Sequence, residues 1–83
     1  MTDGLLQARA RTHGAFADNA RYAQHFKSLF RSSPKWAAMT DIQREALDCI
    51  GLKLARILSN PATADSWADV AGYATLAERS LVE

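Results

Sequence analysis

Apolar residues recur at helical spacing through most of the chain, and turn-forming residues separate the periodic stretches. The spacing of Phe16, Ala23 and Phe30 predicts an amphipathic helix from about residue 15 or 16 to Arg31, with its aromatic stripe in the core. The same period predicts longer helices over about residues 41–59 and 64–81. Leu5 and Leu6 indicate a short first helix over about residues 3–12.

Capping residues sharpen these boundaries. Thr40 precedes the third helix and Gln43 follows three residues later, which is the pattern of a capping box. The Pro61 ring disfavours helical backbone at the residue before it, so the third helix should end near residue 59. Serines before Pro34 favour a short helical turn that carries Trp36.

Strand signals are nearly absent, so residues 1–83 are expected to form a single all-α domain, a small bundle of about four helices. A chain of this length buries only a small core. We therefore expect oligomerisation to complete the bundle.

The third helix has apolar residues on two sides. At 100° per residue, one broad face is expected to form the core: Ala46, Leu47, Ile50, Leu54, Ile57 and Leu58. A second apolar strip lies nearly opposite and consists of Ile42, Cys49 and Leu52. A helix that is apolar on two sides is usually sandwiched between neighbours. The last helix has one apolar stripe, expected to pack inward: Trp67, Val70, Ala71, Ala74, Ala77 and Leu81. Gly72 on its other side predicts the close approach of a helix or of a ligand.

Composition narrows the class of protein. The net charge is +1, but residues 1–38 carry six basic and two acidic residues, whereas residues 39–83 carry four basic and seven acidic residues. This asymmetry favours contact between the halves or with a partner. A lone Cys49, the lack of a signal-peptide pattern and the lack of a long apolar run indicate a cytoplasmic protein without a membrane partner. No basic helix with base-reading spacing is present, so direct nucleic-acid binding is not expected.

Acidic side chains lie beside the apolar sides of the last two helices. Glu45 and Asp48 are three residues apart, and Asp65 and Asp69 are four residues apart. Carboxylates at a helix interface need partners, because an unpaired buried charge is costly. Two partners remain open: a basic side chain such as Lys53 or Arg56, or a divalent cation.

Three segments carry a first resemblance: THGAFADNA, QREALDCIGLKLARIL and DSWADVAGYATLAERSL. Together they resemble a family of small phage and prophage proteins of unknown function, over about residues 9–82. The matching positions include His13, Asn19, Lys53, Arg56 and Tyr73, and we take these five as candidate ligand-binding residues. It also implies the cytoplasm of a host bacterium as the setting.

A second resemblance is more distant. In all-α nucleotide pyrophosphatases of the MazG type, paired acidic residues on two helices hold Mg²⁺ against a triphosphate. Glu45 and Asp48 are similar to the first pair, and Asp69 with the following Val70 and Tyr73 is similar to the second. The last Glu of that pattern falls on Ser66, with Asp65 displaced by one residue. The resemblance implies Mg²⁺ as cofactor and four metal ligands: Glu45, Asp48, Asp65 and Asp69.

Two functions follow as hypotheses. In the first, the protein binds or hydrolyses nucleotides through these carboxylates, with basic residues on the phosphates. Because a helix N-terminus attracts anions, His13 is placed to assist at the start of the second helix. In the second, the protein is a non-enzymatic phage accessory protein that binds a host component, as counter-defence or anti-CRISPR inhibitors do. A structural homo-oligomer with a polar seam is the third alternative.

Overall fold

The computed structural model describes residues 15–82, which form three α-helices and one short 3₁₀-helix and contain no strand. These are α2 (Phe16–Arg31), η1 (Trp36–Ala38), α3 (Asp41–Ser59) and α4 (Ala64–Ser80). The all-helical prediction is confirmed over this range. The short helix predicted at residues 3–12 lies outside the described residues, so three of the four expected helices are observed.

The helix boundaries follow the caps that the sequence predicts. The Thr40 hydroxyl accepts a hydrogen bond from the Gln43 backbone N–H at 3.1 Å, and the Gln43 side chain accepts one from the Thr40 backbone N–H at 2.9 Å. This capping box starts α3, and Asn60 ends it one residue before Pro61. The Ser33 hydroxyl accepts from the Lys35 backbone N–H at 3.1 Å and leads the chain into η1.

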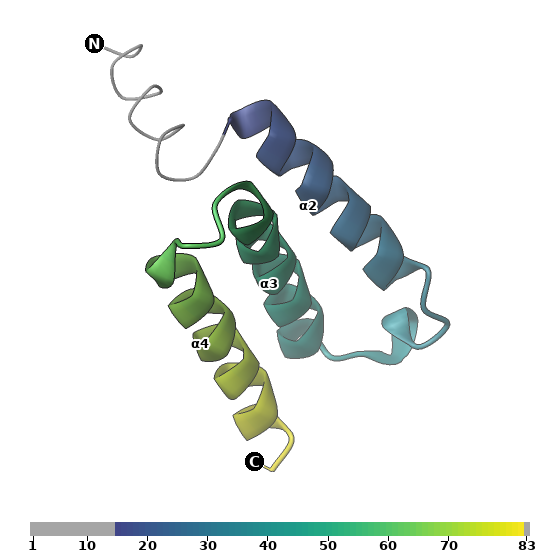
Figure 1. Ribbon diagram of the computed structural model, residues 1–83. Helices are drawn as coiled ribbons and strands as arrows, with labels where there is room; N and C mark the ends of the chain where they lie inside the picture. The colour runs from purple at the N-terminus through teal and green to yellow at the C-terminus, as the bar shows by residue number, and fades with distance from the viewer. Residues whose placement is uncertain (1–14, 83) are drawn as a thin grey trace, which may run out of the picture.

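Helix α3 lies between α2 and α4, so the described chain is a layer of three adjacent helices (Figure 1). Residues with little or no side chain make both contacts possible. A Cβ atom on Gly51 would lie 3.0 Å from Cε2 of Phe30 and 3.4 Å from Cβ of Phe26, so α2 approaches α3 at this glycine. Ala55, one turn later on the same side, is completely buried.

The buried apolar set is small: Ala23, Ala46, Ala55 and Ile57. The prediction that α3 is sandwiched is correct, and Ala46 and Ile57 of the expected core face are buried. The other buried positions of α3 are Gly51 and Ala55, which neither predicted side included. Leu58 of the expected core face is instead 55% exposed, and Ile42 and Leu52 of the opposite strip are exposed as well.

The prediction for α4 is correct only in part. Trp67, Ala71, Ala74 and Leu81 were expected to pack inward, yet all four are exposed, whereas Val70 and Ala77 of the same stripe are half-buried. The side that faces α3 carries Ser66, which is 1% exposed, and the half-buried Val70, Tyr73, Ala77 and Ser80.

In α2, Ala23 is buried as expected, but Phe16 at the start of the aromatic stripe is 82% exposed.

No helix of the described structure approaches Gly72 closely. A Cβ atom on Gly72 would meet no atom within 4 Å beyond the neighbouring backbone of its own helix. The predicted approach of a ligand at this glycine stays a prediction. The glycine that permits close packing is Gly51, because a larger residue there would collide with the Phe30 ring.

Candidate functional site

The layer has two open sides of different chemistry, and one of them gathers the polar groups. Side chains at positions i, i+3, i+4, i+7 and i+11 of a helix share one side. We define the polar face as the side formed in α3 by Glu45, Asp48, Cys49, Leu52 and Arg56, together with Arg31 of α2 and with Asp69 and Tyr73 of α4.

The α2 edge of the polar face is an ion pair. Arg31 donates to both carboxylate oxygens of Asp48, from Nη2 at 2.8 Å and from Nη1 at 3.1 Å. The hydrogen bonds to Asp48 raise the pKa of the Arg31 guanidinium above its ordinary value. The guanidinium carbon also lies 4.7 Å from the centre of the Trp36 ring. This arrangement joins η1, α2 and α3, and it occupies a carboxylate that was predicted to bind metal.

The seam between α3 and α4 holds the second group of polar side chains. Lys53 of α3 contacts Asp69 of α4, with 3.0 Å between Nζ and Oδ2, and the Lys53 side chain is only 15% exposed. The Cys49 thiol donates to Oε2 of Glu45 at 3.7 Å. The sequence allowed either a basic side chain or a divalent cation as the partner of these carboxylates, and for Asp69 the structure shows the basic side chain, Lys53.

Tyr73 of α4 meets these groups at the middle of the seam. Its pKa is raised above the ordinary tyrosine value, first by the charge of Cys49 and by a hydrogen bond with it, then by partial desolvation and by the charges of Asp69 and Glu45. The phenol is thus within electrostatic reach of one carboxylate from each helix. The α3–α4 seam, as we call Glu45, Cys49, Lys53, Asp69 and Tyr73, is the densest cluster of chemically active side chains on the polar face.

The other candidate residues lie elsewhere. Asn19 is buried between α2 and α3, where its Oδ1 accepts from the Ser59 hydroxyl at 2.7 Å. Asp65 is exposed in the first turn of α4. Arg56 is half-buried on the polar face and forms no ion pair within residues 15–82. His13 lies outside the described residues. The structure thus brings together Glu45, Lys53, Asp69 and Tyr73 of the predicted set.

Cys49 is the member of the seam that sequence reasoning assigned to an apolar strip. Its position four residues after Glu45 and four before Lys53 was the available signal, because those three residues share one side of a helix.

The described residues contain no group of three or more His, Cys, Asp or Glu side chains arranged to hold a metal ion. The carboxylates of Glu45 and Asp69 still offer hard oxygen atoms from two facing helices. Mg²⁺ is commonly held by one or two carboxylates, with waters and substrate phosphates completing its coordination. The seam therefore fits a cation that arrives with a phosphate group better than a cation bound by protein ligands alone.

Within residues 15–82, no helix combines the length and the apolar content that crossing a membrane would require.

No curated protein and no solved structure shows significant similarity to the chain. A family model described as "Domain of unknown function (DUF6378)" matches residues 3–81, nearly the whole chain. The protein therefore belongs to the DUF6378 family.

Proposed function

We propose that the α3–α4 seam binds the phosphate groups of a nucleotide together with Mg²⁺. The observation that carries the proposal is the position of Tyr73, which lines one hollow together with Glu45 of α3 and another together with Asp69 of α4. Two carboxylates from facing helices match the way in which Mg²⁺–phosphate complexes are held. When bound, the cation would withdraw charge from the phosphoryl oxygens and so favour attack of water on the phosphorus atom.

Basic side chains beside the seam supply the phosphate contacts in this proposal. Lys53 holds Asp69 now, and its ammonium group is a point charge suited to phosphate. Arg56 lies one turn further along α3, with its guanidinium free of ion pairs in the described structure. Arg31 is committed to Asp48 and serves the architecture of the face.

Titration calorimetry with each nucleoside triphosphate and deoxynucleoside triphosphate tests the proposal, with and without Mg²⁺. We expect heat from at least one nucleotide only when Mg²⁺ is present, and no heat from Mg²⁺ alone, because the seam lacks a complete cage. Release of pyrophosphate would identify hydrolysis, whereas binding without release would identify a nucleotide-binding protein. No heat with any nucleotide would contradict the proposal.

A matched pair of variants locates the site. Glu45→Gln removes a seam carboxylate that forms no ion pair in the described structure, so the fold should survive. Glu78→Gln makes the same change near the end of α4, away from the seam. The affinity for the nucleotide should fall at least about tenfold in Glu45→Gln, because a tenfold loss corresponds to one charge-assisted contact. It should stay unchanged in Glu78→Gln.

A second candidate function rests on the hollow that adjoins the seam on α4. This hollow of about 520 Å³ is lined by Asp69 and Tyr73 of the seam and by neighbouring residues of α4 that include Gly72 and Leu76. Its open lining suits the docking of a host protein by a phage accessory protein. If Gly72→Arg abolishes capture of one host protein while leaving nucleotide binding intact, this function is supported.

We also infer that the chain forms a homo-oligomer. Only four apolar side chains of the described residues are buried, three of them alanines, which is a small core for a domain of this length. Self-association would bury additional apolar surface without another gene product.

A further inference from the structure

A hollow adjoins the seam on the side toward the start of α3, and we call it the end hollow. It has a volume of about 330 Å³ and is lined by Asp41, Ile42, Glu45 and Ala46 of α3 and by Tyr73 and Leu76 of α4. Tyr73 and Leu76 also line the hollow that contains Asp69. The two hollows therefore meet at these two side chains of α4.

Uncovered apolar side chains from both helices border the end hollow. Ile42 of α3 is 53% exposed and Leu76 of α4 is 58% exposed. Ile42 lies three residues before Glu45, so both belong to the side of α3 that carries the polar face. Small-ligand sites are concave, mostly apolar and about 300–1,000 Å³ in volume, with a few polar groups that fix the orientation of the ligand. The end hollow has this character at the small end of the range.

The chemistry of the polar face changes in a fixed order along α3. On one side of this helix, from its start to its end, lie Ile42, Glu45, Cys49, Lys53 and Arg56. Helix α4 runs antiparallel beside it (Figure 1), and there the same order is Leu76, Tyr73 and Asp69. The face thus changes from apolar through acidic to basic in one direction.

We propose that the end hollow binds the base of a nucleotide whose phosphates lie toward Lys53 and Arg56. This inference rests on the nucleotide function proposed above, and it adds the place of the base and the direction of the bound molecule. A nucleotide is planar and weakly polar at its base and anionic at its phosphates, so only this direction matches the order of the face. Ile42 and Lys53 are separated by about 16 Å along the helix axis, which an extended nucleoside triphosphate can span.

The lining of the end hollow also determines which bases it accepts. Tyr73 supplies an aromatic ring for stacking, and every base has a face that can stack on it. Of the six lining residues, only Tyr73 has a hydrogen-bond donor in its side chain at neutral pH. Distinguishing bases by their edges requires a pattern of donors and acceptors, which this lining does not provide. The end hollow should therefore accept purines and pyrimidines alike.

Inorganic tripolyphosphate separates the two ends of the ligand, because it carries the phosphate chain without a nucleoside. Titration calorimetry on the full chain with Mg²⁺ measures its affinity and that of the four ribonucleoside triphosphates. We expect the four nucleotides to agree within about fivefold, because stacking tolerates every base. Tripolyphosphate should bind at least about tenfold more weakly, because it lacks the stacked base.

Two exposed leucines of the polar face provide a matched pair of variants. Leu76→Ser removes an apolar wall of the end hollow, whereas Leu52→Ser makes the same change where neither hollow is lined. Leu76→Ser should weaken nucleotide binding about tenfold, as expected for one lost apolar contact, and should leave tripolyphosphate binding unchanged. Leu52→Ser should change neither. Circular dichroism checks the fold, and Ile42→Ser repeats the test from α3 if Leu76→Ser does not fold.

The direction of the nucleotide has its own readout. Arg56 lies at the basic end of the face and forms no ion pair within residues 15–82. Arg56→Gln should weaken nucleotides and tripolyphosphate by the same factor, because both present phosphates to it. A loss confined to nucleotides would show that the base, and not the phosphate chain, lies at this end.

The possible failures are distinguishable. Tripolyphosphate that binds as tightly as the nucleotides, or normal nucleotide binding by Leu76→Ser, would overturn the base site and leave the phosphate site standing. A strong preference for one base would overturn binding by stacking alone. A change in the mass of Leu76→Ser, measured by light scattering, would assign the end hollow to a contact between copies of the chain and overturn the base site. No binding of any of these ligands would overturn both proposals.

Discussion

On its α2 side, α3 presents Gly51 to the Phe30 ring and to Cβ of Phe26, whereas on its α4 side it faces a helix whose most buried residue is Ser66. The first contact is so close at Gly51 that a larger residue would collide with the Phe30 ring. The second contact holds the Lys53–Asp69 ion pair and the Tyr73 phenol. The difference teaches that steric fit limits substitution where α2 meets α3, whereas the reactive groups collect where α3 meets α4.

Overfilling the tight side should have the largest effect. Gly51→Leu would drive a side chain into the Phe30 ring, and we expect the free energy of unfolding to fall by about 1–3 kcal/mol. Urea unfolding followed by circular dichroism measures it. Gly72→Leu makes the same change in α4, where the space is open. Equal losses in the two variants would contradict the account of Gly51.

Breaking the ion pair on the α4 side should cost more than breaking the one on the α2 side. Asp69→Asn leaves the 15% exposed Lys53 without its partner, with an expected loss of about 1 kcal/mol. Asp48→Asn leaves Arg31, which is better exposed and still lies over Trp36, so its loss should be smaller. Unfolding midpoints of the two variants decide the order, and the reverse order would show that Lys53 rehydrates freely.

Filling the open glycine of α4 should be mildly stabilising. Gly72→Ala removes backbone freedom from the unfolded chain and meets no atom in the described structure. A gain of about 0.5–1 kcal/mol in the free energy of unfolding is expected. If the variant is instead destabilised, Gly72 is in contact with something outside the described residues, such as a partner.

The smallest expected effect is that of Tyr73→Phe on how the free energy of unfolding changes at alkaline pH. The raised pKa of Tyr73 means that the unfolded chain loses the phenolic proton at a lower pH than the folded chain does. This contribution to stability is complete below the ordinary tyrosine pKa of about 10 and is lost as the pH rises through the higher pKa of the folded state. Tyr73→Phe should therefore lose less stability than wild type between about pH 9 and pH 11. Parallel losses would assign the alkaline effect to other groups.

Much of the local structure could be predicted from the sequence. The Thr40–Gln43 capping box, the stop before Pro61 and the start of α2 at Phe16 depend on neighbouring residues, and the structure confirms them. The first resemblance predicted a family of unknown function, and the family match over residues 3–81 is consistent with that; the phage setting stays a prediction.

The packing directions could not be predicted with the same certainty. Hydrophobic periodicity assigns the largest apolar side chains to the interior, so it placed Trp67 and Leu58 in the core and Gly72 at a close contact. In this layer the helices meet instead along Gly51, Ala55, Ala46 and Ser66, because small residues let helix axes approach. The choice between a basic partner and a cation for Asp69 likewise depended on which side of α4 faces α3.

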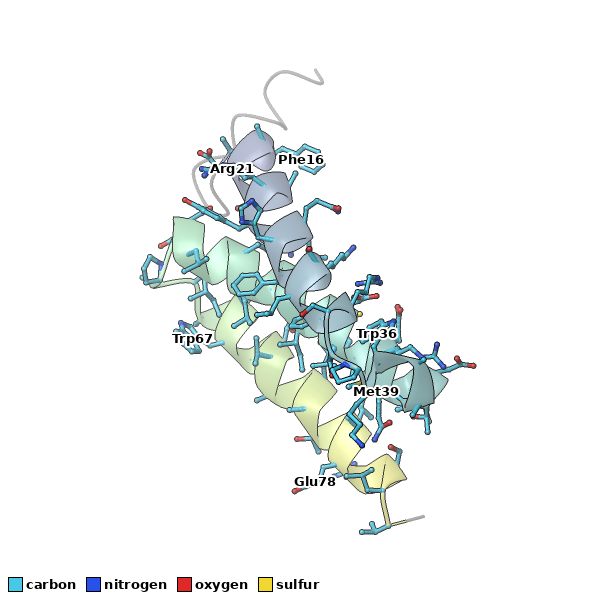
Figure 2. All side chains as sticks on the ribbon, turned by 90° about the vertical axis from the view of Figure 1, so that its right-hand side faces the viewer. Phe16, Arg21, Trp36, Met39, Trp67 and Glu78 are labelled. Atoms are coloured by element: carbon cyan, nitrogen blue, oxygen red, sulfur yellow. The ribbon has the colours of Figure 1, made fainter. Side chains whose placement is uncertain are left out.

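The opposite placement of the only two tryptophans gives this protein a pair of built-in optical reporters. Trp36 lies under the Arg31 guanidinium on the polar face, and the Trp67 indole donates to the Pro61 carbonyl at 2.8 Å near the start of α4, on the other side of the view in Figure 2. Replacing either one with phenylalanine leaves a single emitter that senses one side of the layer. Changes on the polar face and changes at the start of α4 can then be followed as two separate fluorescence signals from the same chain.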